Sequence, residues 1–123
     1  MAKRLVSANA SDIIKMNAEE LKNSIKASEG RVVLTEIVAT REAYEPGITG
    51  AEIACAFGSN MVLLNGVDIF SPVIEGLGQY DDNNFVELLK KYTGRPIGLN
   101  LEPVDTEADM LEDRVVISKG RQA

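Results

Sequence analysis

The sequence contains no histidine, no tryptophan and a single cysteine, Cys55. The absence of histidine excludes Ser-His and Cys-His catalysis, and every metal site with a histidine ligand, from this polypeptide. Any general acid or base must therefore be an Asp, Glu, Lys, Tyr or Cys side chain. One cysteine cannot form an internal disulfide, and no secretory apolar segment follows Lys3 and Arg4, so we expect a cytoplasmic protein. Cys55 lies between two alanines of a predicted helix, which is typical of a small core residue.

Long hydrophobic runs and basic stripes are also missing. No segment approaches the ~20 apolar residues of a membrane helix, and the net charge of −6 disfavours nucleic acid and anionic membranes as partners. A small-molecule substrate remains possible, because it needs only a local site. The 123 residues are 45% hydrophobic, which fits one globular domain over residues 1–123 with a real core.

The helices are indicated by capping signals. Asn17 with Glu20, Thr49 with Glu52, and Asn84 with Glu87 all have capping-box spacing. They predict a helix that begins after Asn17 and two short helices that begin near residues 50 and 85. A short helical turn capped by Ser11 is expected before the first of them, so the N-terminal helical segment covers residues 11–29. The first helix is expected to stop at Gly30, and the other two at Gly58 and Gly94.

Three apolar segments alternate with these helices. Residues 31–39 (RVVLTEIVA), 60–70 (NMVLLNGVDIF) and 95–104 (RPIGLNLEPV) are rich in β-branched and aliphatic residues, and the first two are typical of strands buried on both faces. Strands that alternate with helices predict an α/β fold with a parallel sheet and right-handed crossovers. The loops that enter the strands are short and those that leave them are long, so we expect function at the carboxyl ends of the strands.

Polar side chains are predicted to gather at those ends. Because strand residues alternate between faces, Glu36, Asn65, Asn100 and Glu102 are expected on one face, near one rim of the sheet. These four are the candidate catalytic residues: the carboxylates would serve as acid-base groups or, with Asp68 or Glu102 as ligands, would hold a divalent cation such as Mg²⁺. The competing interpretation is structural, since polar residues at strand ends also bond to backbone or meet solvent.

Other candidates are basic. Arg41 in the first exit loop, and Lys119 and Arg121 in the terminal SKGR segment, are candidate substrate-binding residues, because cations grip phosphate or carboxylate groups. A solvated tail is the alternative interpretation for the last two. The sequence has no GxGxxG motif, P-loop or CxxC pair.

The segments VVLTEIVATREAY, GAEIACAFGSNMVLLNGVDIF, RPIGLNLEPVD and ISKGR, taken in this order, resemble the N-terminal part of an uncharacterised bacterial family of TIM-barrel proteins. Its members are often labelled haloacid dehalogenase-like hydrolases, and some resemble phosphonomutase-type, phosphate-binding barrels. The dehalogenase DxD motif is absent, because the first strand ends TEIVAT. The resemblance therefore implies the first part of a (βα)8 barrel, with a phosphate-binding loop beyond residue 123.

A closed eight-stranded barrel takes about 250 residues, so three strands are expected to form an incomplete barrel that is a fragment or that associates with other copies or barrel segments. The leading hypothesis is the N-terminal segment of a barrel enzyme, a hydrolase or lyase for a small phosphorylated or carboxylated metabolite. Because the implied phosphate-binding loop lies beyond residue 123, this segment can be inactive when it is alone. The alternative is a flavodoxin-like ligand-binding or oligomer-forming module without catalysis. Strand order distinguishes them: a barrel arc runs 1-2-3, and a doubly wound sheet runs 2-1-3.

Overall fold

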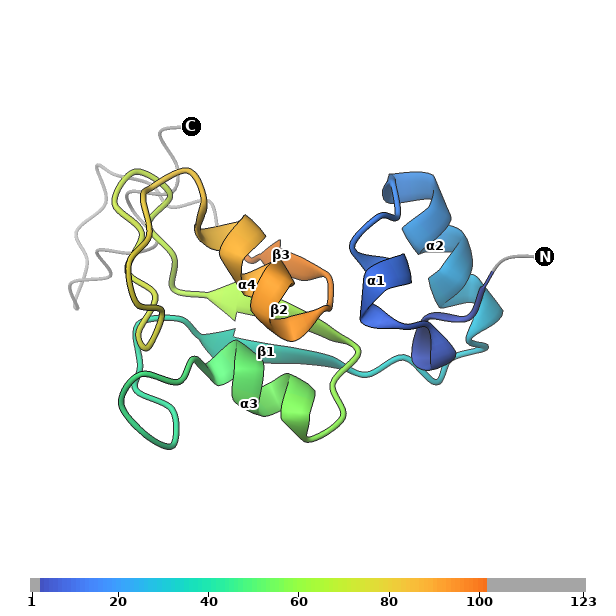
Figure 1. The fold of residues 1–123 in the computed structure, drawn as a ribbon, viewed down its shortest axis with the longest axis horizontal. Helices are drawn as coiled ribbons and strands as arrows, with labels where there is room; N and C mark the ends of the chain where they lie inside the picture. Colours follow the sequence, from blue (N-terminus) through green and yellow to red (C-terminus); the bar gives the residue numbers. More distant parts are fainter. Residues whose placement is uncertain (1–2, 102–123) are drawn as a thin grey trace, which may run out of the picture.

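The computed structural model describes residues 3–101. In these residues a mixed α/β chain forms a three-stranded sheet in which β1 (Leu34–Val38), β2 (Met61–Asn65) and β3 (Ile97–Leu99) are parallel and lie side by side in the order β1-β2-β3. Figure 1 shows the three arrows pointing the same way. The parallel sheet is confirmed, and its order is the one that a barrel arc predicts, not the 2-1-3 order of a flavodoxin-like sheet.

Two crossover helices cover one face of this sheet. Helix α3 (Gly50–Ala56) joins β1 to β2, and α4 (Phe85–Thr93) joins β2 to β3 (Figure 1). Beneath them lies the main core, in which Val62, Leu64 and Leu89 are almost fully buried. Ile37, Ile97 and Leu99 pack against this core from the same face of the sheet. Alternation along the strands therefore places one side-chain set under the helices and the other on the opposite face.

The opposite face of the sheet has no helix on it within the described part of the chain. Leu34 is 52% exposed and Val38 is 45% exposed, although both are β-strand residues. The prediction that the first strand is buried on both faces is therefore wrong for residues 3–101. The sequence pattern is typical of a strand that is buried on both faces, but helices pack on only one face of the sheet in the described residues.

The N-terminal segment forms a separate small unit at the amino ends of the strands. It consists of the 3₁₀ turn η1 (Leu5–Ser7), α1 (Ala10–Ile13) and α2 (Ala18–Ala27), and Figure 1 shows it beyond the strand tails. Its core of Leu5, Ala8 and Ile13 packs against Val32 and Met61, where β1 and β2 begin. The unit thus closes the end of the sheet that lies opposite the long exit loops.

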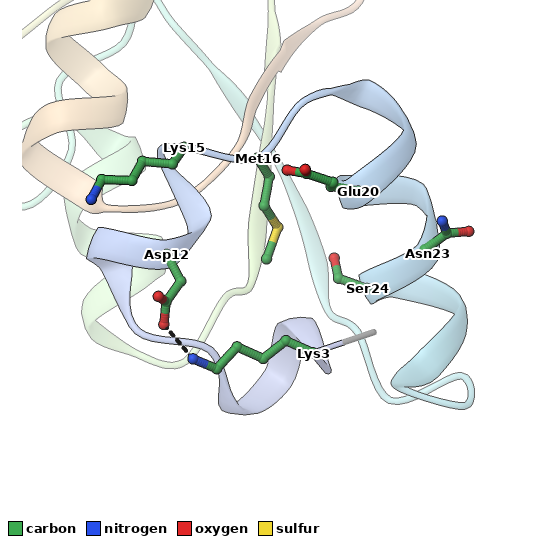
Figure 2. A pocket seen from close by; sticks show the side chains of 7 residues that line it. All are labelled: Lys3, Asp12, Lys15, Met16, Glu20, Asn23 and Ser24. Atoms are coloured by element: carbon green, nitrogen blue, oxygen red, sulfur yellow. Dashed lines mark hydrogen bonds and ion pairs between the residues drawn. The ribbon is translucent and has the colours of Figure 1, made fainter. Parts of the chain in front are cut away.

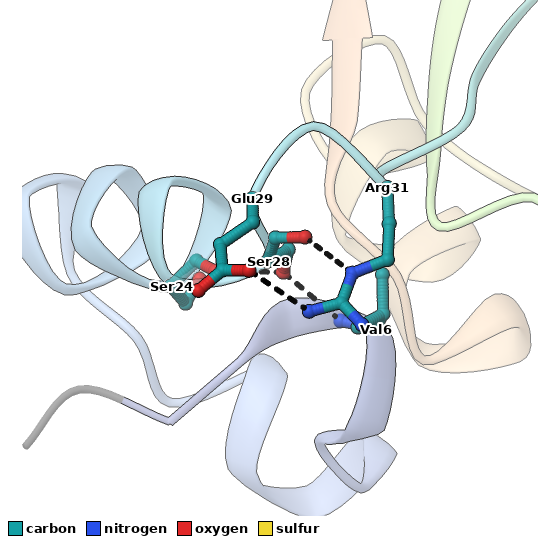
Figure 3. Close-up of polar contacts among 5 residues, drawn as sticks. All are labelled: Val6, Ser24, Ser28, Glu29 and Arg31. Carbon is teal, nitrogen blue, oxygen red and sulfur yellow. Dashed lines mark hydrogen bonds and ion pairs between the residues drawn. The ribbon is translucent and has the colours of Figure 1, made fainter.

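Two buried serines tie this unit together (Figure 3). The Ser28 hydroxyl donates to the carbonyl of Ser24 at 2.9 Å and accepts the Val6 backbone N–H at 3.4 Å. Arg31 Nε donates to the Ser28 carbonyl at 2.9 Å, and its guanidinium lies 3.7 Å from the Glu29 carboxylate. These bonds satisfy carbonyls at the end of α2 and hold η1 against it.

The capping signals succeed twice and fail twice. Reciprocal capping boxes are present at Asn17 and at Thr49, as their spacing predicts. The short helical turn predicted before the Asn17 helix is present as α1, but it begins after Asn9, so Ser11 does not cap it. The predicted box at Asn84 is wrong, because its side chain accepts the Asp81 backbone N–H and Glu87 forms an ion pair with Lys90 instead.

Candidate functional site

Three predicted site residues meet at the carboxyl rim of the sheet. Glu36 is in β1, Asn65 ends β2, and Asn100 directly follows β3. The Asn65 side-chain amide donates to Glu36 Oε1 at 2.7 Å, and the Asn100 amide donates to the same oxygen at 3.4 Å. One carboxylate oxygen therefore receives two amide donors from the two neighbouring strands. We call these three residues the rim cluster.

Strand register explains why the rim cluster forms. Glu36 pairs with Leu63, and Leu63 pairs with Gly98, so these residues share the helix-free face. Asn65 and Asn100 are each two residues further along their strands and keep that face. Gly98 leaves room there, because a Cβ at this position would lie 3.2 Å from the Leu63 side chain. The two-residue alternation in the sequence was thus sufficient to predict the meeting.

The geometry fixes the orientation of the two amides. A carboxylate oxygen only accepts hydrogen bonds, so each asparagine must turn its NH₂ group toward Glu36. The second Glu36 oxygen and both amide oxygens then remain as acceptors on the helix-free face. Within residues 3–101 the cluster is a solvent-accessible carboxylate held in place by two neutral donors. Such a group can accept a proton from a ligand or bind a hydrogen-bond donor.

The other exit residues that were predicted are more dispersed. Asp68 follows β2, is 8% exposed, and accepts the Phe70 backbone N–H through Oδ1 at 3.0 Å. Arg41 is exposed in the loop after β1, where its backbone N–H donates to the Val38 carbonyl at 3.2 Å. Their roles as metal ligand and substrate-binding residue stay predictions.

Three predicted site residues, Glu102, Lys119 and Arg121, lie outside the described residues. Residues 3–101 hold no group of three or more His, Cys, Asp or Glu side chains placed to bind a metal ion. The described rim residues alone therefore do not supply the oxygen-rich cage that Mg²⁺ prefers. A divalent cation remains a prediction that depends on Glu102.

The sequence reasoning did not identify how the long exit loop after β2 is held. The Tyr80 hydroxyl accepts the Ile74 backbone N–H at 3.0 Å and donates to the Pro72 carbonyl at 3.1 Å. The Glu75 backbone N–H donates to the Ala39 carbonyl at 2.9 Å, which fixes this loop to the chain leaving β1. The signal available for Tyr80 was an aromatic residue in a loop that also carries the buried apolar residues Ile74 and Leu77.

A pocket of about 500 Å³ lies in the N-terminal unit, away from the rim cluster (Figure 2). Figure 2 shows the Met16 side chain between α1 and α2, with the ion pair of Lys3 and Asp12 below it. The distance between Lys3 Nζ and Asp12 Oδ2 is 2.6 Å. Two cationic and two anionic side chains line the pocket, so their formal charges cancel. They are Lys3, Lys15, Asp12 and Glu20.

Cys55 lies half-buried in α3 and packs against the main core, as its alanine neighbours predict. Burial raises the pKa of its thiol, and this effect outweighs the opposing influence of Arg95 and Thr93. The thiol is therefore protonated at neutral pH, which is the state of an inert core cysteine.

The fold and the rim cluster together define a parallel α/β unit with a polar cluster at the carboxyl ends of its strands. The chain belongs to a family described as a domain of unknown function (DUF7916), whose model matches residues 6–123. No curated protein and no solved structure matches the chain. No helix in the described range is long and apolar enough to cross a membrane.

Proposed function

We propose that the chain is the N-terminal part of a (βα)8-barrel enzyme that acts on a small phosphorylated or carboxylated metabolite at the rim cluster. The observation that carries the proposal is the double hydrogen bond to Glu36 Oε1 from Asn65 and Asn100. Side chains from the ends of three adjacent parallel strands meet there at one carboxylate. This is the end of the sheet at which α/β enzymes have their active sites.

Glu36 is the proposed acid-base group, and the asparagines are its positioning residues. Two fixed donors hold the carboxylate in one orientation without neutralising it, since amides carry no charge. A group that transfers a proton must be held within hydrogen-bond reach of its target, about 2.6–3.2 Å. Strand order supports the barrel, because β1-β2-β3 with both helices on one face is the arrangement of a barrel arc.

The test is a turnover screen with a matched variant. The 123-residue chain, and a longer barrel protein of which it forms the first part, are each incubated with small phosphorylated and carboxylated metabolites, and substrate loss and product formation are followed by ¹H and ³¹P NMR. We expect Glu36→Gln, which keeps size and removes the base, to lower kcat by about 10²–10⁴-fold. Glu87→Gln, an exposed carboxylate on α4, is the control and should leave kcat unchanged. Equal and measurable turnover in wild type and Glu36→Gln would overturn the assignment of Glu36. No turnover in any of these proteins would overturn the proposed activity.

A second candidate is an oligomer-forming module without catalysis. The helix-free sheet face favours it, because the side chains of Leu34 and Val38 are about half exposed there. A second copy of this chain is the proposed cover. Self-association through this face, together with an absence of turnover, would support this candidate.

A further inference from the structure

We propose that the rim cluster binds the vicinal hydroxyl groups of a polyol, such as the diol of a sugar. This inference rests on the proposed function and names the part of the substrate that the cluster contacts. It follows from the hydrogen-bond donors and acceptors of the rim cluster that are left after its side chains have bonded to one another. The juxtaposition of Glu36, Asn65 and Asn100 is the observation that carries it.

Each asparagine NH₂ group has two N–H bonds, and one of them is used on Glu36 Oε1. Among the bonds that residues 3–101 make, one N–H therefore remains on Asn65 and one on Asn100, and the amide oxygens of both residues and Glu36 Oε2 remain as acceptors. The cluster thus offers donors and acceptors together, on side chains from three neighbouring strands.

Three ligand chemistries can be compared with this set. A phosphate or carboxylate only accepts hydrogen bonds and is repelled by the Glu36 charge. An ammonium group only donates, so it leaves the two spare N–H groups without an acceptor. A hydroxyl donates one bond and accepts others, so adjacent hydroxyls can donate to Glu36 Oε2 and accept from the amides. Of these three chemistries, only the hydroxyl matches both the donors and the acceptors of the cluster, and two adjacent hydroxyls can use both at once.

The location of the cluster agrees with this choice. Glu36 is exposed, and Asn65 and Asn100 are half-buried, so a ligand can reach the cluster from the helix-free face. Bound hydroxyls replace water that makes the same kinds of bond, and recognition therefore depends on the spacing of the two hydroxyls. An anionic group of the same substrate would be held elsewhere, as the basic candidates predict.

The experiment uses the side-chain NH₂ signals of Asn65 and Asn100 in ¹H–¹⁵N NMR spectra of the full 123-residue chain. Methyl β-D-ribofuranoside (called ribose below), methylammonium and inorganic phosphate are titrated separately. Methyl 2-deoxy-β-D-ribofuranoside (called deoxyribose below) is the control, because its ring is locked as a furanose and it has no vicinal diol. We expect ribose to shift both signals and deoxyribose to shift them clearly less. In Glu36→Gln the dissociation constant for ribose should rise by at least about tenfold. Asn23→Ala, which removes an asparagine of the N-terminal pocket, should respond as the wild type does.

Each other outcome counts against the inference. If methylammonium or phosphate shifts the signals and ribose does not, the polyol assignment is wrong and the acid-base proposal still stands on its turnover test. If ribose and deoxyribose act equally, the vicinal diol is not what the cluster recognises. If none of the probes shifts the two signals, the polyol inference is overturned. A turnover loss in Glu36→Gln would then still support the acid-base role alone.

Discussion

Thr49 is fully buried, and its side chain makes two of the three hydrogen bonds that it shares with Glu52 in the α3 cap. Thr49 Oγ1 accepts the Glu52 backbone N–H at 3.1 Å and donates to the Glu52 carboxylate at 2.7 Å. We expect Thr49→Ala to lower the free energy of unfolding by about 1–2 kcal/mol, because an orphan helix N–H loses its acceptor. Urea denaturation measures this change. Asn84→Ala is the matched control, since Asn84 precedes α4 without capping it, and it should cost less.

Asp12 provides a residue-scale prediction about pH. The hydrogen bond from Lys3 holds the pKa of Asp12 below its usual value of 3.8. A lowered folded-state pKa means that the pair contributes stability above 3.8, and that this contribution is lost as the pH falls through the folded value. The pair is solvent-exposed, so we expect a small effect on stability.

The pKa itself is the sharper measurement for Asp12. In an NMR titration of the carboxyl group, Lys3→Ala should return the pKa toward 3.8. Lys15→Ala should shift it less, because Lys15 acts only through a weaker charge interaction. Equal shifts in the two variants would show that the 2.6 Å contact between Lys3 and Asp12 is not the cause.

At the scale of elements, Gly76 is where the loop after β2 meets the start of α3. Its φ is +86°, and a Cβ there would lie 2.4 Å from the Ile48 carbonyl oxygen. We expect Gly76→Ala to destabilise the fold by about 1–3 kcal/mol, because a side chain is disfavoured at this φ and also meets fixed backbone. Thermal unfolding followed by circular dichroism measures it.

Gly78 is the control two residues away. A Cβ at Gly78 would meet nothing within 4 Å. Gly78→Ala should therefore leave the melting temperature nearly unchanged or raise it slightly, because alanine restricts the unfolded chain. Similar losses in both variants would mean that the loop tolerates no added side chain anywhere, and that the contact with Ile48 is not decisive.

The same scale shows what the sequence could predict. Alternation of helices and strands gave the parallel sheet, and the two-residue period placed Glu36, Asn65 and Asn100 on one face. The strands are shorter than predicted, since β3 is only Ile97–Leu99 within the described residues. The spacing of Asn84 and Glu87 did not suffice to predict a cap for α4. The Asn84 side chain accepts the backbone N–H of Asp81 in the preceding loop instead of an N–H of the helix. Local patterns specify faces and periods, whereas competition between partners depends on the folded loops.

At the scale of the whole molecule, the sheet is incomplete within residues 3–101. Neither β1 nor β3 has a second neighbouring strand there, and Leu34 and Val38 expose apolar surface on the face that lacks helices. Unpaired strand edges and exposed apolar faces favour association. The net charge of −6 opposes contact between copies, and salt screens this repulsion.

We therefore expect the average mass from sedimentation velocity to rise with protein concentration, and to rise further at higher salt. Leu34→Lys should weaken the association by about tenfold or more, because a partly buried leucine contributes roughly 1.5 kcal/mol and an unpaired lysine is costly to desolvate in an apolar contact. Phe57→Lys is the control: Phe57 is 90% exposed at the end of α3, on the helix side of the sheet. If the chain is a monomer at every concentration, or if Phe57→Lys disrupts association as strongly as Leu34→Lys, the helix-free face is not the contact surface. The exposed apolar side chains would then have to be covered in another way or remain in solvent.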